Sequence, residues 1–273
     1  AFNTAVGFAA GVAVTTGIKN TLIGGLAGDA ITTASQNTAV GYNALTATTT
    51  GAANTAVGFE ALDANTTAAN NTGIGWRALY TNTTGASNTA VGVQALDANT
   101  TGSDNVSVGL ATLTSDTLGN KSVAIGNYSL AYQNFTSATD TYNTAVGYQA
   151  GNRVTTGINN TLIGGLAGDA LTDADYNVAL GVGALTTDTL GSKSTALGSY
   201  ALSNQNFTSA TDAHNTAVGN NAGGAVTTGI NNTLIGSLAG DAITTASYSV
   251  AVGQGAATNT TTSSQGFTAV GAD

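Results

Sequence analysis

One short motif returns along the whole chain at an almost constant spacing. Its commonest form is Asn-Thr-Ala-Val-Gly, and variants such as NTLIG, NTGIG, NVSVG and SVAIG change single positions. Its glycines are Gly7, Gly24, Gly41, Gly58, Gly75, Gly92, Gly109, Gly126, Gly147, Gly164, Gly181, Gly198, Gly219, Gly236, Gly253 and Gly271. Most of the intervals between them equal the 17-residue step from Gly7 to Gly24, and the few exceptions are longer. Such a period is the signature of a repeat architecture, in which each repeat packs on its neighbours.

The columns of the repeat predict a strand that ends at the glycine. The residue before the glycine is aliphatic in every copy, and the residue three before it is Thr or Val. Positions two apart on a strand share a face, so these columns are predicted to line the interior, with Val57, Val91 and Val146 among the core residues. After the glycine, a second short strand and a Thr/Gly/Asn turn are expected to complete the coil.

The middle column of the motif is mostly alanine, for example Ala39, Ala56 and Ala90. Small side chains allow a close approach of another backbone, so this column is predicted to form a face that meets a second chain. On that prediction, leucine in place of these alanines disrupts association more than the same change in the Thr-rich turns.

Identical strands that return with this period pair only with their own copies in neighbouring coils. The sequence therefore predicts an all-β fold, a parallel β-solenoid of about 16 coils that rise by about 4.8 Å each. Helices are disfavoured because Gly and Thr interrupt the short apolar runs. The Asn column is expected to stack into amide ladders. Residues 1–273 are predicted to form a single solenoid that is an interior section of a longer fibre.

Two coils are lengthened by inserts near 131–142 and 203–214. Insertions in solenoids map to loops on one side, so both inserts are expected to protrude and to carry any surface-binding site. The candidate binding residues are Phe135, Thr136, Asp140, Phe207, Thr208 and Asp212.

Composition excludes several functional classes. The chain has 14 acidic and 5 basic residues and a net charge of −9, so it lacks the basic footprint of a nucleic-acid-binding protein. It has no cysteine, which excludes disulfides and thiolate metal sites. No apolar run approaches the roughly 20 residues of a membrane span. We expect no cofactor and no membrane span.

Catalytic and metal-binding groups are sparse. The single histidine, His214, lies in the second insert where the first insert has Tyr142, and it is interpreted as a surface residue. Asp173 and Asp175 form the densest carboxylate pair and are interpreted as solvated turn residues, with weak divalent-cation binding as the alternative. No carboxylate spacing recurs that would favour a glycosidase pair. The sequence therefore predicts a protein that is not an enzyme.

Two other columns have alternative interpretations. Phe8, Tyr42, Phe59 and Trp76 follow their glycines and are interpreted as a packing stripe, with a stacking surface for sugars as the alternative. Paired threonines such as Thr66 and Thr67 recur in the turns, and flat threonine arrays order water. An ice-binding or carbohydrate-binding solenoid is therefore kept as a minor hypothesis.

The coils SVAIGNYSLA (122–131) and NTAVGYQAG (143–151) resemble the head repeats of trimeric autotransporter adhesins of the YadA type. They are also similar to the NTAVG arrays of phage tail-fibre proteins, and the resemblance covers essentially the whole chain. It implies a left-handed parallel β-roll, three chains side by side, and an extracellular, cell-surface or virion location. Adhesin heads have shorter coils than the ones in this chain, so the phage-fibre form fits better.

The leading functional hypothesis is therefore a non-enzymatic structural or adhesive fibre segment of an extracellular or virion appendage. Its expected partners are further copies of itself, as a homotrimer, and host or cell-surface glycans. The alternative is a subunit of a self-polymerising extracellular filament.

Overall fold

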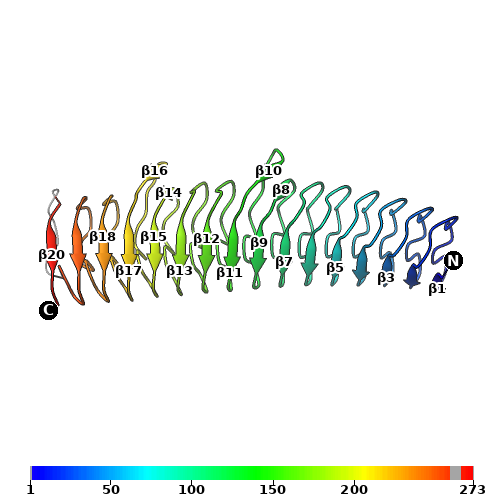
Figure 1. Cartoon of the computed structure of the whole chain (residues 1–273), viewed down its shortest axis with the longest axis horizontal. Helices are drawn as coiled ribbons and strands as arrows, with labels where there is room; N and C mark the ends of the chain where they lie inside the picture. Colours follow the sequence, from blue (N-terminus) through cyan, green and yellow to red (C-terminus); the bar gives the residue numbers. More distant parts are fainter. Residues whose placement is uncertain (1, 259–265, 273) are drawn as a thin grey trace. The chain divides into compact units, whose positions relative to one another are not determined.

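A computed structural model describes residues 2–258 and 266–272. These residues form strands and turns, with no helix among them. They divide into two compact units, Ala1–Thr141 and Tyr142–Asp273. Each unit is a parallel β-solenoid with a 17-residue repeat, and the described chain makes about 15 turns (Figure 1). The predicted all-β parallel solenoid is confirmed, while its left-handedness and its trimeric state stay predictions.

Each motif copy in the described chain forms one three-residue strand, and in each unit these strands make one parallel ladder. In unit 1 they are β1 (Thr4–Val6), β2 (Thr21–Ile23), β3 (Thr38–Val40), β4 (Thr55–Val57), β5 (Thr72–Ile74), β6 (Thr89–Val91), β7 (Val106–Val108) and β9 (Val123–Ile125). In unit 2 they are β11 (Thr144–Val146), β12 (Thr161–Ile163), β13 (Val178–Leu180), β15 (Thr195–Leu197), β17 (Thr216–Val218), β18 (Thr233–Ile235), β19 (Val250–Val252) and β20 (Thr268–Val270).

Four shorter strands belong to the lengthened coils. In unit 1, β8 (Gly119–Asn120) pairs in parallel with β10 (Thr139–Asp140). In unit 2, β14 (Gly191–Ser192) pairs in the same way with β16 (Thr211–Asp212). The inserts therefore return to the coil through a small ladder of their own.

The register of the main ladder places identical motif positions side by side. In β3 and β4, for example, Thr38 pairs with Thr55 and Val40 pairs with Val57. A slip of one residue would exchange the two faces of the sheet. Every column of the sequence therefore becomes a straight row of side chains within each unit.

The assignment of the two faces in the sequence analysis is wrong. Ala39, Ala56 and Ala90 are fully buried, with none of their surface exposed, and they line the interior of the coil. The flanking Thr and aliphatic residues point outward, so Val57 and Val91 are only half-buried. Alternation correctly grouped the columns, but in most coils leucines from the turn fill the interior and leave room only for a small residue on the inward side of the strand. Val146 is half-buried in the same way.

The interior is filled mainly from the segment after the glycine. Leu45, Leu62 and Leu79 are fully buried and pack against the strand alanines. The expected second strand is absent there, because this segment is a turn with left-handed backbone at two positions per coil, such as Asn43 (φ 56°) and Leu45 (φ 56°). The left-handed positions turn the chain sharply enough to close so short a coil.

The NTLIG coils fill the same volume from the opposite side. Leu22 is fully buried in the middle of β2, where other coils have alanine. The positions that would otherwise carry interior leucines are Gly11 and Gly28, and a Cβ at them would lie 2.6 and 2.8 Å from the Leu22 methyl groups. The strand leucine, together with Ile31, whose Cδ1 would lie 2.7 Å from a Cβ at Gly28, therefore occupies the space that turn leucines fill in other coils.

The asparagine column joins neighbouring coils through hydrogen bonds in the interior. Asn71 is fully buried, its Nδ2 donates to the carbonyl of Gly85 at 2.8 Å, and its Oδ1 accepts the N–H of Asn88 at 2.9 Å. The predicted ladder is confirmed, although most of its links run from side chain to main chain. Because each buried amide has partners in two coils, its polar groups cost little to bury.

Candidate functional surfaces

The outward residues of the strands form an uncharged surface that we call the outer strand face. It consists of the first and third residues of each three-residue strand, and all of these are Thr, Val, Ile or Leu. Ile23, Ile74 and Ile125 in unit 1 are each about 39% exposed. In unit 2 the equivalent Leu180, Leu197 and Ile235 are about 40% exposed. The sequence analysis placed this row in the core and so missed it as a surface.

The outer strand face is extended. Eight strands at about 4.8 Å spacing give it a length of about 34 Å in each unit. A contiguous apolar surface of that kind, in contrast to scattered single residues, is typical of a site of contact with another molecule. Hydroxyl groups lie only along the threonine row, and the aliphatic row has no polar side-chain atom.

An aromatic row borders this face in unit 1. The rings of Tyr42 and Phe59 are stacked with centroids 5.6 Å apart and an interplanar angle of 19°. A Cβ added at Gly25 would lie 3.3 Å from the Tyr42 ring, so the ring also lies against the Gly25 backbone. Its faces are therefore directed at neighbouring coils, and its edge is exposed. This geometry favours packing over sugar stacking, which needs open ring faces.

The threonine pairs of the turns are partly committed to hydrogen bonds between coils. Thr66 Oγ1 donates to the carbonyl of Thr83 at 3.1 Å, and Thr83 Oγ1 donates to that of Thr100 at 3.0 Å. The second threonine of each pair, such as Thr67 or Thr84, is exposed. The first row strengthens the ladder between coils, and only the second row is free to contact water.

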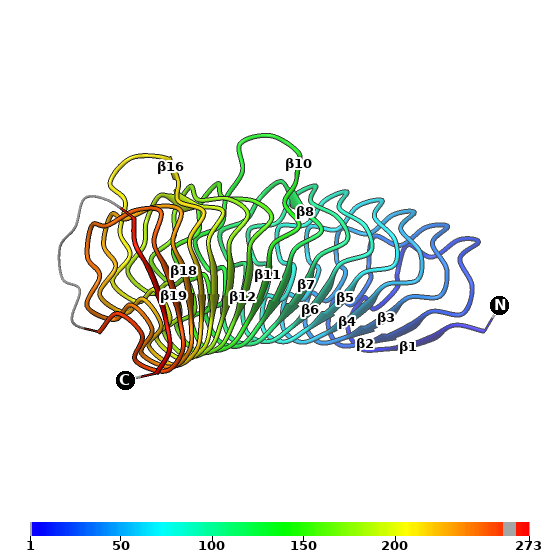
Figure 2. The same cartoon turned by 60° about the vertical axis from the view of Figure 1, so that its left-hand side comes forward.

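The first insert leaves the coil in a loop next to β10 (Figure 2). Thr136 and Asp140 are exposed, and Lys121 Nζ lies 2.5 Å from Asp140 Oδ2. Phe135 is only 6% exposed. Its assignment as a surface-binding residue is therefore wrong, whereas Thr136 and Asp140 are accessible.

The second insert repeats this arrangement in unit 2, next to β16 (Figure 2). Thr208 and Asp212 are exposed, and Lys193 Nζ lies 2.5 Å from Asp212 Oδ2. Phe207 is 6% exposed and is a packing residue like its counterpart in the first insert. The two loops therefore present the same short sequence, NFTSATD, on the same kind of base.

A buried aspartate carboxyl group holds each loop at its base. In unit 2, Asp188 Oδ1 accepts the N–H groups of Gly191 and Phe207, both at 3.1 Å. Its Oδ2 accepts a 2.5 Å hydrogen bond from Gln205 Nε2, which also donates to Ser194 Oγ at 3.1 Å. In unit 1 the same positions are Asp116, Gln133 and Ser122. The sequence analysis missed these residues, although an acid in a column of Asn, Thr and aliphatic residues was visible.

The remaining titratable candidates are His214 and the pair Asp173 and Asp175. His214 is exposed in the second insert. Asp173 accepts a 2.6 Å hydrogen bond from Thr156, and Asp175 accepts the N–H of Ile158 at 2.7 Å. Burial raises the pKa of the Asp175 carboxyl, and nearby Asp173 adds to this, while the Ile158 N–H opposes it. Among the described residues no three His, Cys, Asp or Glu side chains gather as metal ligands would.

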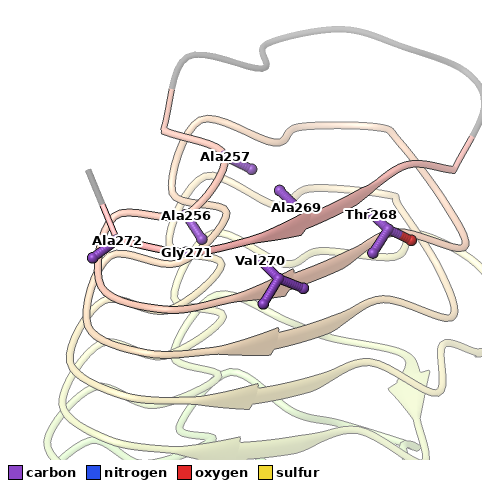
Figure 3. A pocket seen from close by; sticks show the side chains of 7 residues that line it. All are labelled: Ala256, Ala257, Thr268, Ala269, Val270, Gly271 and Ala272. Carbon is purple, nitrogen blue, oxygen red and sulfur yellow. The ribbon is translucent and has the colours of Figure 1, made fainter.

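Figure 3 shows a pocket at the last described coil of unit 2. Its lining residues are Ala256, Ala257, Thr268, Ala269, Val270, Gly271 and Ala272. Apart from the Thr268 hydroxyl, these side chains carry no group that donates or accepts a proton. These described lining residues therefore offer no constellation for acid–base or nucleophilic chemistry.

Comparison with known proteins identifies no relative. No protein-family description, curated protein or solved structure matches the chain. Within residues 2–258 and 266–272 we find no helix long and apolar enough to cross a membrane.

Proposed function

We propose that this chain is a structural segment of a trimeric, non-enzymatic adhesive fibre on an extracellular or virion appendage. The observation that carries the proposal is the outer strand face, an uncharged Thr/aliphatic surface that continues over every three-residue strand of each unit. The resemblance of the NTAVG coils to adhesin heads and phage fibres supports the same assembly.

A second copy of the chain is the partner that fits this face. Covering an exposed apolar row is favourable, because each Å² of apolar surface removed from water lowers the free energy by about 25 cal/mol. Copies aligned in parallel present the same row at the same height along the repeat. Three such faces turned toward a common axis would therefore cover one another without any charged group being buried. The outward threonines fit the margin of such a contact, where hydroxyls still reach water.

The first prediction is that charge on the outer strand face breaks the assembly. Val57→Lys with Ile74→Lys places two ammonium groups where copies would meet, and burying unpaired charges costs several kcal/mol. We expect this variant to keep its β-sheet circular dichroism and to sediment as a monomer. The matched control, Thr67→Lys with Thr84→Lys, adds the same charges to exposed turn positions of the same two coils. Association that survives equally in both variants would exclude this face as the contact.

We place the adhesive function on the two insert loops, with host or cell-surface glycans as partners. Their exposed tips carry hydroxyl groups, and each has a Lys–Asp pair beside it. Hydroxyls and a charged pair are groups that hydrogen-bond to sugar hydroxyls. Two identical loops on one chain also favour a ligand that repeats, because linked sites bind with avidity.

The second prediction concerns these tips. Thr136→Glu with Thr208→Glu is expected to lower binding to a bacterial surface-glycan array by at least about tenfold, because it adds charge to the exposed tips. Thr67→Glu with Thr84→Glu is the control for added charge and is expected to bind as the unmodified chain does. A glycan signal that the loop variant keeps at full strength would move the adhesive site elsewhere.

Ice binding is a second candidate function for the outer strand face. It is favoured by the in-register repetition of threonine and aliphatic side chains in β1–β6. Because assembly and ice binding would compete for one surface, a monomeric chain that inhibits ice growth would favour this candidate. A length-heterogeneous polymer would favour a filament subunit.

A further inference from the structure

An inner polar column rises through unit 1 toward the base of the first insert loop. Its members occupy the same position in successive coils and are all fully buried. They are Thr48, Asn65, Asn82, Asn99, Asp116 and Gln133. The column is separate from the asparagines that precede the strands, and nothing in the assembly proposed above uses it.

Each amide of this column donates to the residue one coil earlier. Asn65 Nδ2 lies 3.1 Å from Thr48 Oγ1, and Asn82 Nδ2 lies 3.0 Å from Asn65 Oδ1. Asn99 Nδ2 continues the series at 2.8 Å from Asn82 Oδ1. Beyond the next residue, Gln133 Nε2 donates to Asp116 Oδ2 at 2.5 Å. The direction of donation is therefore the same at every step whose donor is an amide.

The orientation of these amides is fixed by the main chain. The Nδ2 atoms of Asn82 and Asn99 also donate to the carbonyls of Gly85 and Gly102, each at 3.0 Å. Turning either amide over would direct its oxygen at a carbonyl oxygen. The donor and acceptor ends of such amides are assigned from the hydrogen-bond network, and this network allows one assignment.

One step of the column lacks a donor. Within the described chain, Asn99 Oδ1 is buried and has no hydrogen-bond partner. The residue one coil later is Asp116, whose carboxylate form has no proton to donate. A buried acceptor without a partner is unfavourable, because it has lost its hydrogen bonds to water and gained none in the protein. A single proton on the Asp116 carboxyl would supply the missing donor.

The surroundings of Asp116 favour that proton. Burial raises the pKa of this carboxyl, while hydrogen bonds from Gln133 and from the main chain of Gly119, Phe135 and Leu118 lower it without reversing the shift. No charged group contributes to this shift from the coils on either side. The nearby Lys121 is at the surface and is paired with Asp140.

We propose that the base of the first insert loop is a proton-binding site, in which Asp116 keeps its carboxyl proton in the folded protein and donates it to Asn99 Oδ1. A protonated carboxyl accepts from Gly119 and Gln133 and donates in the same position. An asparagine there would have to give up one of the accepted bonds.

Unit 2 contains an equivalent loop base, but it has no counterpart of the acceptor Asn99 Oδ1. Asp188 and Gln205 repeat the loop base, but the residue one coil before Asp188 is Leu171, which is fully buried and has no polar side-chain atom. The two loop bases therefore differ in the residue one coil before the aspartate. At the first base this residue has a buried oxygen without a hydrogen-bond donor, and at the second it has no polar side-chain atom. The unsatisfied acceptor therefore singles out the first loop base.

The test is a pH titration of the full chain with ¹³C-carboxyl aspartate, followed by isotope-edited infrared spectroscopy from below to above the ordinary aspartate pKa near 3.9. The signal of interest is the carboxylic-acid band that persists above that value. We expect a neutral carboxylic-acid band that is lost in Asp116→Asn and kept in Asp188→Asn. Its absence from the unmodified chain, its survival in Asp116→Asn, or its loss in Asp188→Asn would overturn the proposal.

A second variant keeps the test decisive if Asp116→Asn does not fold. Asn99→Ala removes the acceptor and admits water, and both changes favour the carboxylate. We expect the pH at which the neutral band disappears to fall by about one unit or more, a tenfold change in proton affinity. An unchanged midpoint would show that Asn99 does not receive the proton.

The proposal also fixes the sign of a pH effect on stability. Because folding raises the pKa of Asp116, its contribution is complete below the unfolded value and is lost as the pH rises through the folded value. As the pH rises from the unfolded-state pKa of Asp116 to its folded-state pKa, the melting temperature of the unmodified chain should therefore fall more steeply than that of Asp116→Asn.

Discussion

Gly164→Ala is expected to destabilise unit 2 by about 4 kcal/mol, in the range reached only by backbone strain or a disrupted core. Gly164 has φ 131°, a conformation that residues with a Cβ rarely adopt. A Cβ there would lie 2.5 Å from the carbonyl oxygen of Gly181 in the next coil. The substitution therefore strains the backbone and forces two coils apart. Thermal unfolding followed by circular dichroism measures the effect.

The adjacent residue is the control for this prediction. A Cβ at Gly165 would meet only the carbonyl oxygen of Tyr148, at 4.0 Å, and its backbone is outside the left-handed region. We expect Gly165→Ala to change stability by about 0.5 kcal/mol or less, as surface substitutions usually do. Similar losses in both variants would show that the motif glycines are not required by the stacking of the coils.

Ala56→Leu is expected to lower the melting temperature strongly by overfilling the interior of unit 1. Ala56 is fully buried, and the interior leucines Leu45 and Leu62 are fully buried beside the same rows. Extra methylene groups in a packed core cost about 1–3 kcal/mol. The defect should appear in the unfolding of the chain itself, and association is affected only as a consequence.

The NTLIG coils supply the rescue. Combining Ala56→Leu with Leu45→Gly and Leu62→Gly clears the two turn positions that border the strand leucine, as Gly11 and Gly28 border Leu22. Glycine is also suited to the left-handed backbone of Leu45 and Leu62. We expect the triple variant to regain most of the melting temperature lost by Ala56→Leu. A triple variant no more stable than the single one would contradict the volume exchange.

Periodicity was sufficient to predict the solenoid, its parallel ladder and the asparagine column. It was not sufficient to decide which strand face points inward, because alternation groups residues by face without a sign. Hydrophobicity suggested Val57, whereas the narrow coil takes Ala56. The decisive signal was present in the NTLIG coils, where Leu22 appears together with Gly28. Such a paired exchange of volume is expected only between residues that share the interior.

For the inserts, too, the sequence predicted part of the structure: it located the loops but did not show which of their side chains are buried. Sequence alone identified both loops, but it could not separate Phe135, which is buried, from Thr136, which is exposed. That difference depends on how the loop folds back onto its coil. The role of Asp116 was hidden as well, because it requires the register of the coils to place it after Asn99 and before Gln133.

Sedimentation equilibrium of the unmodified chain tests the central claim most directly, since the outer strand face was assigned to contacts between copies. The account predicts a single species with three times the chain mass of 26.5 kDa. A stable species at 26.5 kDa that does not associate over the micromolar range would contradict it.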